Sequence, residues 1–522
     1  MEPAPAKAPG RPRDRRARPA SSMREKAIQV FFGGNAFVAV VVLALITLFL
    51  LREGVGFFAQ NLRSVRAYRA CGLEYVDIIR EQADAHAALT RSLNQVRARE
   101  TRSMKLAGKS ETYVQNDVAA LDRLAEEFSD AGTELSGLVS DLSDQAVAIR
   151  DRFFGSPDRA KSEAIPEVDE VSQSGELATQ VAALKSAAAA YDEIRANVAG
   201  RLATLLQSAP QLADPDAQRA LDRWKASVRN YLGAFDGQAK RLREWDSRKP
   251  VPWSRSVNSF LFGREWITAS FWQDWYGIIP LLAGSLMVSA VALTIAVPLG
   301  VASAIYISEI AGRAEQNFIK PYIEFIAAIP SVVLGFFGIA VVGQAIRTAS
   351  QSSWLEWVPF FPITERLNVF TAGALLALMA VPTIFTLSED ALRNVPRGFK
   401  EASYALGANR LQTIGRVLIP ASLSGIISAI LLGFGRVIGE TMVVLLCAGN
   451  RIAIPDFTQG LGAFFQPVHT MTGIIAQEMG EVVRGSIHYR ALFMVGLCLF
   501  AVTLAINYTA QRIAHRYRMS IG

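Results

Sequence analysis

Residue types that carry soluble-enzyme chemistry are scarce in this chain of 522 residues. It has three cysteines, four histidines and only 19% charged residues, against 51% hydrophobic residues. The cysteines are too few and too scattered for a disulfide framework, and no Cys-x-x-Cys or paired-histidine spacing indicates a metal site. We therefore expect no catalytic residues and no metal ligands, and the surplus of apolar residues predicts a membrane protein.

A nucleotide-binding loop is also missing. The segment Leu106-Ala107-Gly108-Lys109-Ser110 imitates the end of a P-loop, but the position of its first glycine is occupied by Ser103. No other segment has the required spacing of glycine, lysine and serine or threonine. We expect that the chain binds no ATP by that route and has no cofactor of its own.

The surplus of positive charge is concentrated at the N-terminus. Residues 1–27 contain eight Lys and Arg against three Asp and Glu. Such a segment can bind nucleic acid, but ahead of an apolar run it is more simply explained as a disordered tail that holds the N-terminus in the cytoplasm. We expect no nucleic-acid partner.

Long apolar runs dominate the rest of the sequence, and each reaches the roughly 20 residues that a spanning helix needs. Five runs are free of charge and one contains only Arg436 and Glu440. The runs are Gln29–Leu51, Gly277–Ser308, Phe325–Ile346, Leu367–Ser388, Val417–Asn450 and Ala491–Gln511. We predict an all-α membrane protein with six transmembrane helices in lipid, the first over residues 28–51 and five within residues 277–522.

The distribution of Lys and Arg between the loops orients these helices. The tails and loops on one side hold eighteen Lys and Arg, and the two short loops on the other side hold five. The positive-inside rule therefore predicts that both termini are cytoplasmic and that residues 52–276 are periplasmic. Trp266, Trp272, Trp275 and Tyr276, just before the second span, are typical of an aromatic belt at the outer membrane surface.

Residues 52–276 differ from the spans because they are polar and rich in alanine. Apolar residues recur there every seven positions, the spacing of a packed helical bundle. The first series consists of Val114, Leu121, Phe128, Leu135, Leu142 and Ile149 and predicts one long helix. We expect an extracytoplasmic helical-bundle domain, which could dock a partner or sense a ligand.

The predicted cytoplasmic loop 389–417 carries the first recognisable motif. Glu401-Ala402-Ser403 is followed after three residues by Gly407, and nine residues later by Val417-Leu418-Ile419-Pro420. A small-residue helix, a glycine turn and a proline at the re-entry to the membrane suit a short rigid element that transmits motion to the spans. A generic amphipathic loop at the membrane surface is the alternative explanation.

This loop resembles the EAA loop of ABC importer permeases, with mild departures at Ser403, Val417 and Ile419. The resemblance implies the ABC permease fold for residues 277–522. It also implies two short helices that lie in a groove of a separate ATPase, with Gly407 at the turn between them. Glu401, Ala402, Ser403, Gly407 and Pro420 are the coupling residues it indicates.

Two charges inside the sixth apolar run need a reason. Arg436 and Glu440 are expected one helical turn apart on one helix face, and each buried charge costs about 2.5 to 3.5 kcal/mol on insertion scales. Arg436 could bind an oxyanion, while Glu440 holds the guanidinium or accepts a proton from the anion. Alternatively the two form an ion pair that only fixes helix packing. Gly433, Gly435 and Gly439 would let another helix approach closely.

The block Leu432–Asn450, which includes Gly439-Glu440-Thr441-Met442, resembles PstC-type phosphate permeases, as do Ile329-Pro330-Ser331 and the outer segment 470–478. The resemblance implies a phosphate importer of the bacterial inner membrane, with Arg436, Glu440 and Thr441 in the substrate pathway. It also implies a PstA-like companion permease, an ABC ATPase dimer that hydrolyses ATP, and an extracytoplasmic phosphate-binding protein. The outer domain is a departure from this family.

Two alternatives stay open. A permease for another oxyanion, sulfate or molybdate, would have the same architecture. A membrane sensor could instead use the outer bundle to detect a ligand, although the sequence contains no recognisable signalling output domain.

Overall fold

The computed structural model describes residues 23–155, 174–268, 270, 272–355, 357, 358 and 360–516. The basic tail expected over residues 1–27 lies mostly outside these ranges, and its last residues, from Met23, begin the first helix. Within the described ranges the chain is almost entirely helical, with one two-stranded antiparallel sheet formed by β1 (Trp266–Ile267) and β2 (Trp275–Tyr276).

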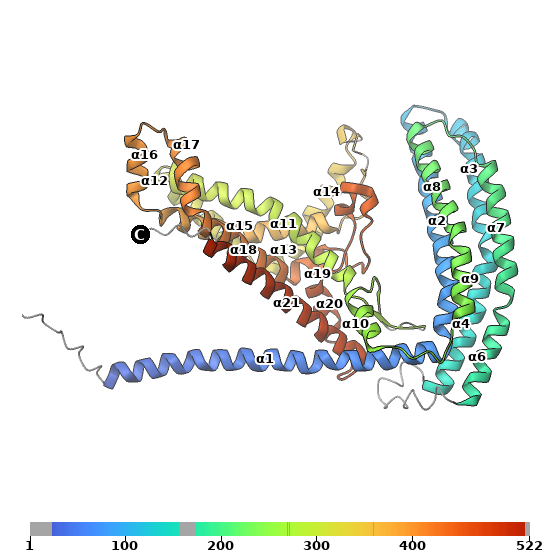
Figure 1. Cartoon of the computed structure of the whole chain (residues 1–522). Coiled ribbons are helices and arrows are strands. Elements are labelled where there is room, and N and C mark those ends of the chain that lie inside the picture. The colour runs from blue at the N-terminus through green and yellow to red at the C-terminus, as the bar shows by residue number, and fades with distance from the viewer. Residues whose placement is uncertain are drawn as a thin grey trace, which may run out of the picture. The chain divides into compact units, whose positions relative to one another are not determined.

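Six helices in these ranges are long and apolar enough to cross a membrane, which confirms the predicted number (Figure 1). The helices concerned are α1 (Met23–Ala70), α11 (Ile279–Ile305), the pair α13 (Ser331–Phe337) and α14 (Gly343–Ser350), α15 (Val369–Arg393), the pair α17 (Arg410–Thr413) and α18 (Ile419–Gly439), and α21 (Ile487–Arg516). Single π-helical turns over Gly338–Val342 and Ile414–Leu418 join the two pairs.

Helix α1 divides at Arg52. From Val30 to Leu51 its apolar side chains are mostly exposed, as expected for a span that faces lipid. From Glu53 onward the helix belongs to the second unit, in which Phe57 is fully buried.

The third span differs from the prediction. It begins at Ser331, not Phe325, because the chain breaks at Ile329–Pro330 and the preceding helix, α12 (Arg313–Ala328), is separate. Proline has no N–H to donate and pushes the residue before it out of the helical region, and Ile329 accordingly has φ −70° and ψ 124°. The charge-free run therefore combines the end of one helix with the start of another.

Four spans form the centre of the permease domain. Helix α15 packs against α11 and α18, and α18 packs against α21. Gly433 allows the close approach that its small size predicted, because a Cβ there would lie 2.7 Å from Cγ1 of Ile384 on α15. Gly435 and Gly439 do not serve this purpose, since a Cβ at either would meet nothing closer than 4.0 Å.

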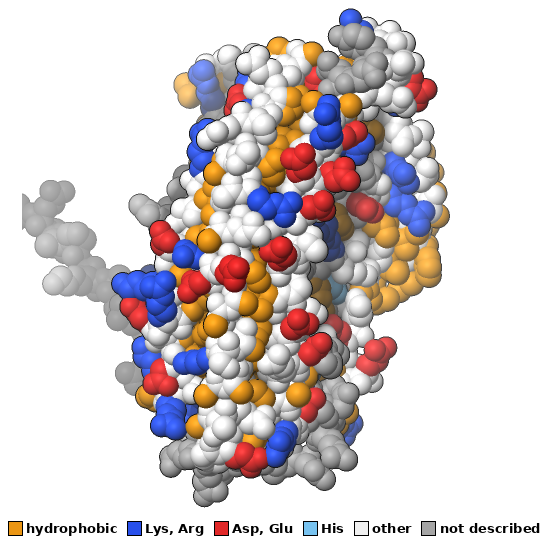
Figure 2. Space-filling model, turned by 90° about the vertical axis from the view of Figure 1, so that its right-hand side faces the viewer, with side chains coloured by type: hydrophobic (Ala, Val, Ile, Leu, Met, Phe, Trp, Pro, Cys, Tyr) orange, Lys and Arg blue, Asp and Glu red, His pale blue; other side chains and the backbone are white. Residues whose placement is uncertain are grey.

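The outer bundle consists of helices between the first two spans. They are α2 (Leu73–Leu106), α3 (Glu111–Ala131), α4 (Thr133–Phe154), α6 (Gly175–Ala187), α7 (Ala190–Ser208), α8 (Pro215–Gly233) and α9 (Phe235–Glu244). Helix α2 contacts α3, α4, α8 and α9. Acidic and basic side chains are interspersed on the face shown in Figure 2, as is usual for a surface in water.

The heptad residues that predicted the bundle are all buried, from Val114 through Ile149. The single long helix expected there is wrong, because it is interrupted at Gly132 between α3 and α4. The ring of His86 occupies that point, and a Cβ at residue 132 would lie 2.3 Å from its Cδ2 atom. Heptad spacing continues across the interruption, so the sequence pattern alone does not reveal it.

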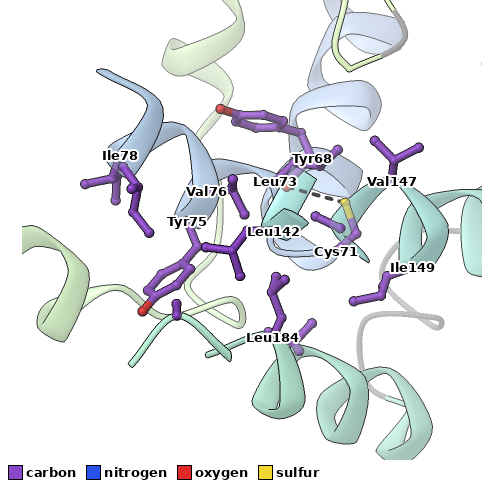
Figure 3. Packing of buried hydrophobic residues seen from close by; sticks show 14 of the residues in the cluster. Tyr68, Cys71, Leu73, Tyr75, Val76, Ile78, Leu142, Val147, Ile149 and Leu184 are labelled. Atoms are coloured by element: carbon purple, nitrogen blue, oxygen red, sulfur yellow. Dashed lines mark hydrogen bonds between the residues drawn. The ribbon is translucent and has the colours of Figure 1, made fainter. Parts of the chain in front are cut away.

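One apolar core lies where α1 ends and the bundle begins (Figure 3). Tyr68 and Cys71 at the α1–α2 junction, together with Leu73, pack toward Leu142 of α4 and Leu184 of α6. A second core, which includes Phe128, Leu202 and Trp224, joins α3, α7 and α8.

The return from the bundle to the membrane runs through α10 (Trp253–Leu261) and the small sheet. Trp266, Trp272 and Tyr276 are buried there, so the expected aromatic belt at the membrane surface is wrong for these three residues. Trp266 and Tyr276 face each other across the two strands, and Arg150 of α4 donates to the carbonyl oxygen of Trp272 at 2.6 Å. The aromatic side chains stabilise this return segment and do not lie at a lipid interface.

Candidate functional site

The two charges of the sixth span lie at a helix break. Helix α18 ends at Gly439, Glu440 is extended with φ −72° and ψ 134°, and a short helix, α19 (Met442–Cys447), follows. The prediction that Arg436 and Glu440 share one face of a continuous helix is therefore wrong. The break places Glu440 beyond the last helical turn.

Two hydrogen bonds of Glu440 stabilise the helix break. Its Oε1 atom accepts a hydrogen bond from the backbone N–H of Met442 at 3.2 Å, and its carbonyl oxygen accepts one from Oγ1 of Thr472 at 2.8 Å. Both groups would otherwise serve a continuing helix. Backbone left unpaired at membrane depth is tolerated where it lines a polar cavity or is buried in protein, so the break is a candidate substrate site.

Arg436 has an unexpected partner. Its side chain is exposed, and Nη1 donates to Oγ1 of Thr383 on α15 at 3.1 Å. Across the described ranges no ion pair joins Arg436 to Glu440. A neutral hydroxyl orients the guanidinium but leaves its positive charge uncompensated.

Thr383 was missed by sequence reasoning. It lies directly after Pro382 in a charge-free span and is 53 positions away from Arg436. A hydroxyl beside a helix-interior proline is a weak local signal, because such side chains often bond the freed backbone. No sequence spacing indicates that it would meet Arg436.

The segment around α20 (Met471–Glu478) contacts the break. Thr470 is the N-cap residue of this helix, and its Oγ1 accepts from the N–H of Gly473 at 3.1 Å. Thr472 in its first turn makes the bond to Glu440 described above. Thr441, the third predicted pathway residue, is half-buried, and its carbonyl oxygen accepts from the N–H of Leu445 at 3.0 Å.

His469 anchors the start of α20. Its Nδ1 atom accepts from the N–H of Thr470 at 3.0 Å, so the ring proton is on Nε2, which donates to Oε1 of Gln477 at 3.1 Å. Burial lowers the pKa of His469. The ring therefore stays neutral at pH 7 and acts as a hydrogen-bonded support for the segment that contacts Glu440.

The coupling-loop motif forms two short helices, as the resemblance implied. Glu401, Ala402 and Ser403 lie in α16 (Arg397–Ala405), and α17 begins at Arg410. Gly407 lies between them with φ +82°, a left-handed conformation that favours glycine. Pro420 is the second residue of α18, which follows directly after the π-helical turn Ile414–Leu418, where the regular hydrogen-bond pattern is already interrupted.

A groove of about 480 Å³ opens along these two helices. Ala402, Ser403 and Gly407 line it, and Leu406 at its edge is 90% exposed. Oγ of Ser403 is hydrogen-bonded to Oγ1 of Thr413 at 2.9 Å, which ties the helices together. An exposed leucine beside a groove of small residues is suited to contact with another protein.

Ion pairs connect the loop to the spans. Lys400 of α16 pairs with the buried Glu309 at the end of the second span at 2.7 Å. Glu389 of α15 is fully buried and pairs with Lys320 at 3.0 Å and Arg393 at 2.7 Å. Sequence reasoning missed both carboxylates, although an acidic residue at the basic end of a span is a signal for such a pair.

Among the described residues, no group of three or more His, Cys, Asp or Glu side chains could hold a metal ion.

Comparison with known proteins supports a transport function. Residues 296–518 match the family of binding-protein-dependent transport system inner membrane components. The probable ABC transporter permease protein YqgH of Bacillus subtilis is 35% identical over 45% of this chain and 72% of its own length. The phosphate transport system permease protein PstC of Pasteurella multocida is 32% identical over 53% of this chain and 84% of its own length.

A further relative and one solved structure are similar over the same half of the chain. PstC of Haemophilus influenzae is 31% identical over 50% of this chain and 84% of its own length. One chain of the MetNI methionine ABC transporter, in an inward-facing conformation, aligns with 46% of the present protein over 94% of the MetNI chain. The sequence identity is 19% and the TM-score is 0.33. At that TM-score the likeness to MetNI does not bear on the assignment.

Proposed function

This chain belongs to the family of binding-protein-dependent ABC importer permeases, and from that membership we propose that it is the permease subunit of a phosphate importer. Members of the family are multi-pass membrane proteins that catalyse no reaction and hold no cofactor. ATP hydrolysis belongs to a separate subunit, and a binding protein delivers the substrate. The identity of the substrate is the step that we add.

The observation that carries the proposal is the uncompensated charge of Arg436. In an apolar span such a charge is costly unless it serves a ligand or a polar path. A guanidinium offers two parallel N–H groups that match two oxygens of an oxyanion, and the Thr383 hydroxyl at 3.1 Å holds it without neutralising it. Arg436 therefore suits an anionic substrate.

Glu440 supplies a reason for phosphate over sulfate. At pH 7 phosphate retains a P–OH group that can donate a hydrogen bond, whereas sulfate has no proton and would meet a repelling carboxylate. Oε1 of Glu440 already accepts from Met442 at 3.2 Å, and its other oxygen is free of a protein partner in the described ranges. Thr441, the next residue along the chain, adds a hydroxyl beside it. The PstC relatives support the same choice.

For the coupling loop, we propose that Glu401, Ala402, Ser403 and Gly407 bind the groove of an ABC ATPase dimer. Pro420 would fix the re-entry of the chain into the membrane. The ion pair of Lys400 with Glu309 at 2.7 Å offers a direct path for motion from α16 to the second span. ATP binding in the partner would thereby drive alternating access.

The assembly we propose contains a PstA-like companion permease and an extracytoplasmic phosphate-binding protein. Both termini are cytoplasmic in this arrangement, residues 52–276 are periplasmic, and the membrane is the bacterial inner membrane. The distribution of Lys and Arg, eighteen against five, supports this orientation.

Transport of labelled phosphate tests the proposal. Cells that lack their own phosphate transporters would express this chain with its companion subunits and take up low micromolar phosphate in the presence of excess sulfate. We expect uptake that requires this chain and ignores sulfate. Uptake blocked by sulfate or molybdate would favour another oxyanion. No uptake by an assembled complex would contradict phosphate import and favour a sensor built on the outer bundle.

A further inference from the structure

Three arginines and no acidic residue are among the described residues that line a cavity beside the outer bundle. The cavity has a volume of about 480 Å³. Two of its arginines, Arg99 and Arg102, come from α2 and a third, Arg223, comes from α8. The other described residues that line it are Gln95, Ala98, Phe360, Phe361, Pro362, Thr458 and Gln459.

These arginines lack the carboxylate partners that neighbouring cations have. Across the described residues, Arg99 has no ion pair, Arg102 donates from Nη1 to the carbonyl oxygen of Phe361, and Arg223 donates from Nε to the carbonyl oxygen of Arg219 at 3.3 Å. Arg97 on α2, in contrast, pairs with Asp122, and Arg219 on α8 pairs with Asp216. The three arginines at the cavity therefore have no carboxylate partner among the described residues.

The core of the bundle fixes the two helices that carry these arginines. Leu93 and Val96 of α2 and Leu221 and Trp224 of α8 lie in the same apolar core. Nε1 of Trp224 also donates to the carbonyl oxygen of Leu89 on α2 at 3.0 Å. Like charges that a rigid core holds at one cavity raise the local concentration of anions, and a bound anion lowers their repulsion.

We propose that this cavity is an oxyanion-binding site of the outer bundle. Guanidinium groups bind phosphate and sulfate oxygens through paired N–H donors, and the amide of Gln95 supplies a further donor. The hydroxyl of Thr458 and Nε2 of Gln459 donate to the carboxylate of Asp456, so the anion is held mainly by the arginines. Under the proposed function its ligand is phosphate, collected outside the membrane before transport. The cavity has no carboxylate in its described lining, so unlike the site at Glu440 it accepts sulfate as well as phosphate.

Binding of labelled phosphate to the purified complex tests this site. The complex is reconstituted in nanodiscs without the binding protein and carries Arg436→Gln, which removes the pathway cation. If that complex does not assemble, Arg436→Met replaces it, because methionine also removes the cation and suits an apolar span. The test variant is Arg102→Gln/Arg223→Gln. The matched control is Arg91→Gln/Arg229→Gln, which removes one exposed arginine from each of the same two helices outside the cavity.

We expect phosphate to bind in the background variant and in the control, and to bind at least about tenfold more weakly in the test variant, as for the loss of charged hydrogen bonds. Excess sulfate should displace it, and added salt should weaken it. Equal phosphate binding in test and control variants would overturn the proposal. A second outcome would also overturn it. If the test variant keeps its phosphate binding and loses only its affinity for the binding protein, the arginines contact carboxylates of that protein and not a free anion. Phosphate uptake by the wild-type complex is measured in parallel, so that failure of the cavity is distinct from failure of the transport function.

Discussion

Among single residues, Arg436 is central to the proposed substrate pathway, and its side chain is held by one neutral partner. Oγ1 of Thr383 and Nη1 of Arg436 are 3.1 Å apart, and the carboxylate of Glu440 is used to cap Met442 beyond the helix break. The guanidinium is thereby oriented by a neutral group. Under the proposed function the two charges have separate roles, which separate substitutions can test.

Glu440→Gln isolates the charge of the carboxylate. Glutamine keeps an oxygen that can accept from the N–H of Met442, so the helix break should persist. We expect phosphate uptake to fall at least about tenfold while the assembled complex is recovered in normal amount. Labelled uptake and co-purification with the ATPase measure the two effects. Normal uptake by this variant would contradict a pathway role for Glu440.

Thr383→Val removes the hydroxyl at nearly constant volume, and Thr383→Ser retains it. We expect valine to raise the KM for phosphate about tenfold, because the guanidinium of Arg436 loses the hydrogen bond that orients it, with a smaller change in the maximal rate. Serine should behave as the wild type. In an Arg436→Gln background the valine substitution should have no further effect, because its partner is gone. An equal loss in both backgrounds would indicate that Thr383 acts only in packing.

At the scale of elements, interruptions in helices create the surfaces that other groups contact. Gly407 separates α16 from α17, and Gly132 separates α3 from α4. The first interruption exposes the coupling groove, and the second accommodates a buried histidine. Both can be tested by changing the residue that permits or fills the interruption.

Gly407→Val places a β-branched residue at φ +82°, a conformation that costs about 1–2 kcal/mol for L-residues. We expect the loop to leave this conformation and ATPase binding to weaken. Gly398→Ala is the control, since a Cβ there meets nothing within 4 Å and residue 398 lies inside α16. Pull-down of the ATPase and ATP-driven uptake are the measurements. Unchanged binding in Gly407→Val would contradict the coupling role of the turn.

His86 makes the bundle sensitive to acid. Burial lowers its pKa, Nε2 is bonded to the carbonyl oxygen of Phe128 at 2.8 Å, and the ring stacks on that of Phe128. Because the unfolded chain binds this proton more readily, the histidine's contribution is complete above the unfolded pKa near 6.5 and is lost as the pH falls below it. The slope is at most about 1.4 kcal/mol per pH unit.

Thermal unfolding followed by tryptophan fluorescence at pH 7.5 and 5.5 tests this effect. We expect the bundle of the wild-type chain to unfold at a lower temperature at pH 5.5. His86→Gln keeps an N–H donor but cannot be protonated, so the difference between the two pH values should shrink. An identical pH difference in the variant would assign the sensitivity to other groups.

At the scale of the whole molecule, two kinds of helical surface are joined in one chain. The spans expose apolar side chains, whereas the outer bundle has a charged surface with interspersed signs (Figure 2). The first surface requires lipid and the second requires water. The distribution of Lys and Arg then decides which side of the membrane holds the bundle.

Labelling of introduced cysteines tests this orientation. Gly137→Cys lies on α4 and Gly398→Cys on the coupling loop, and a Cβ at either meets nothing within 4 Å. In intact spheroplasts a membrane-impermeant maleimide should label residue 137 and leave residue 398 unlabelled until the membrane is opened. Burial raises the pKa of the native Cys71 thiol to about 12, so it should give little background. The reverse labelling pattern would contradict a periplasmic bundle.

Much of the architecture could be predicted from the sequence because it depends on residues that lie close together in the chain. Run length and apolar composition predicted six spans, heptad spacing predicted the buried face of the bundle, and the pattern around Gly407 predicted two short helices. The errors occurred at interruptions. Pro330 was inside an expected span, and Gly132 was inside an expected helix. In each case the apolar pattern continues through the break, and a neighbouring group or the backbone decides where the helix ends.

That this protein is helical, crosses a membrane and carries an arginine and a glutamate in its sixth apolar run could be read from its residues alone, because hydrophobic burial and helix periodicity depend on residues near each other in the chain. The groups that these two charges meet became known from the folded arrangement. Thr383 reaches Arg436 across 53 positions, and Thr472 reaches Glu440 across 32. Contacts between distant segments depend on how packed helices are placed, and no local pattern encodes that placement.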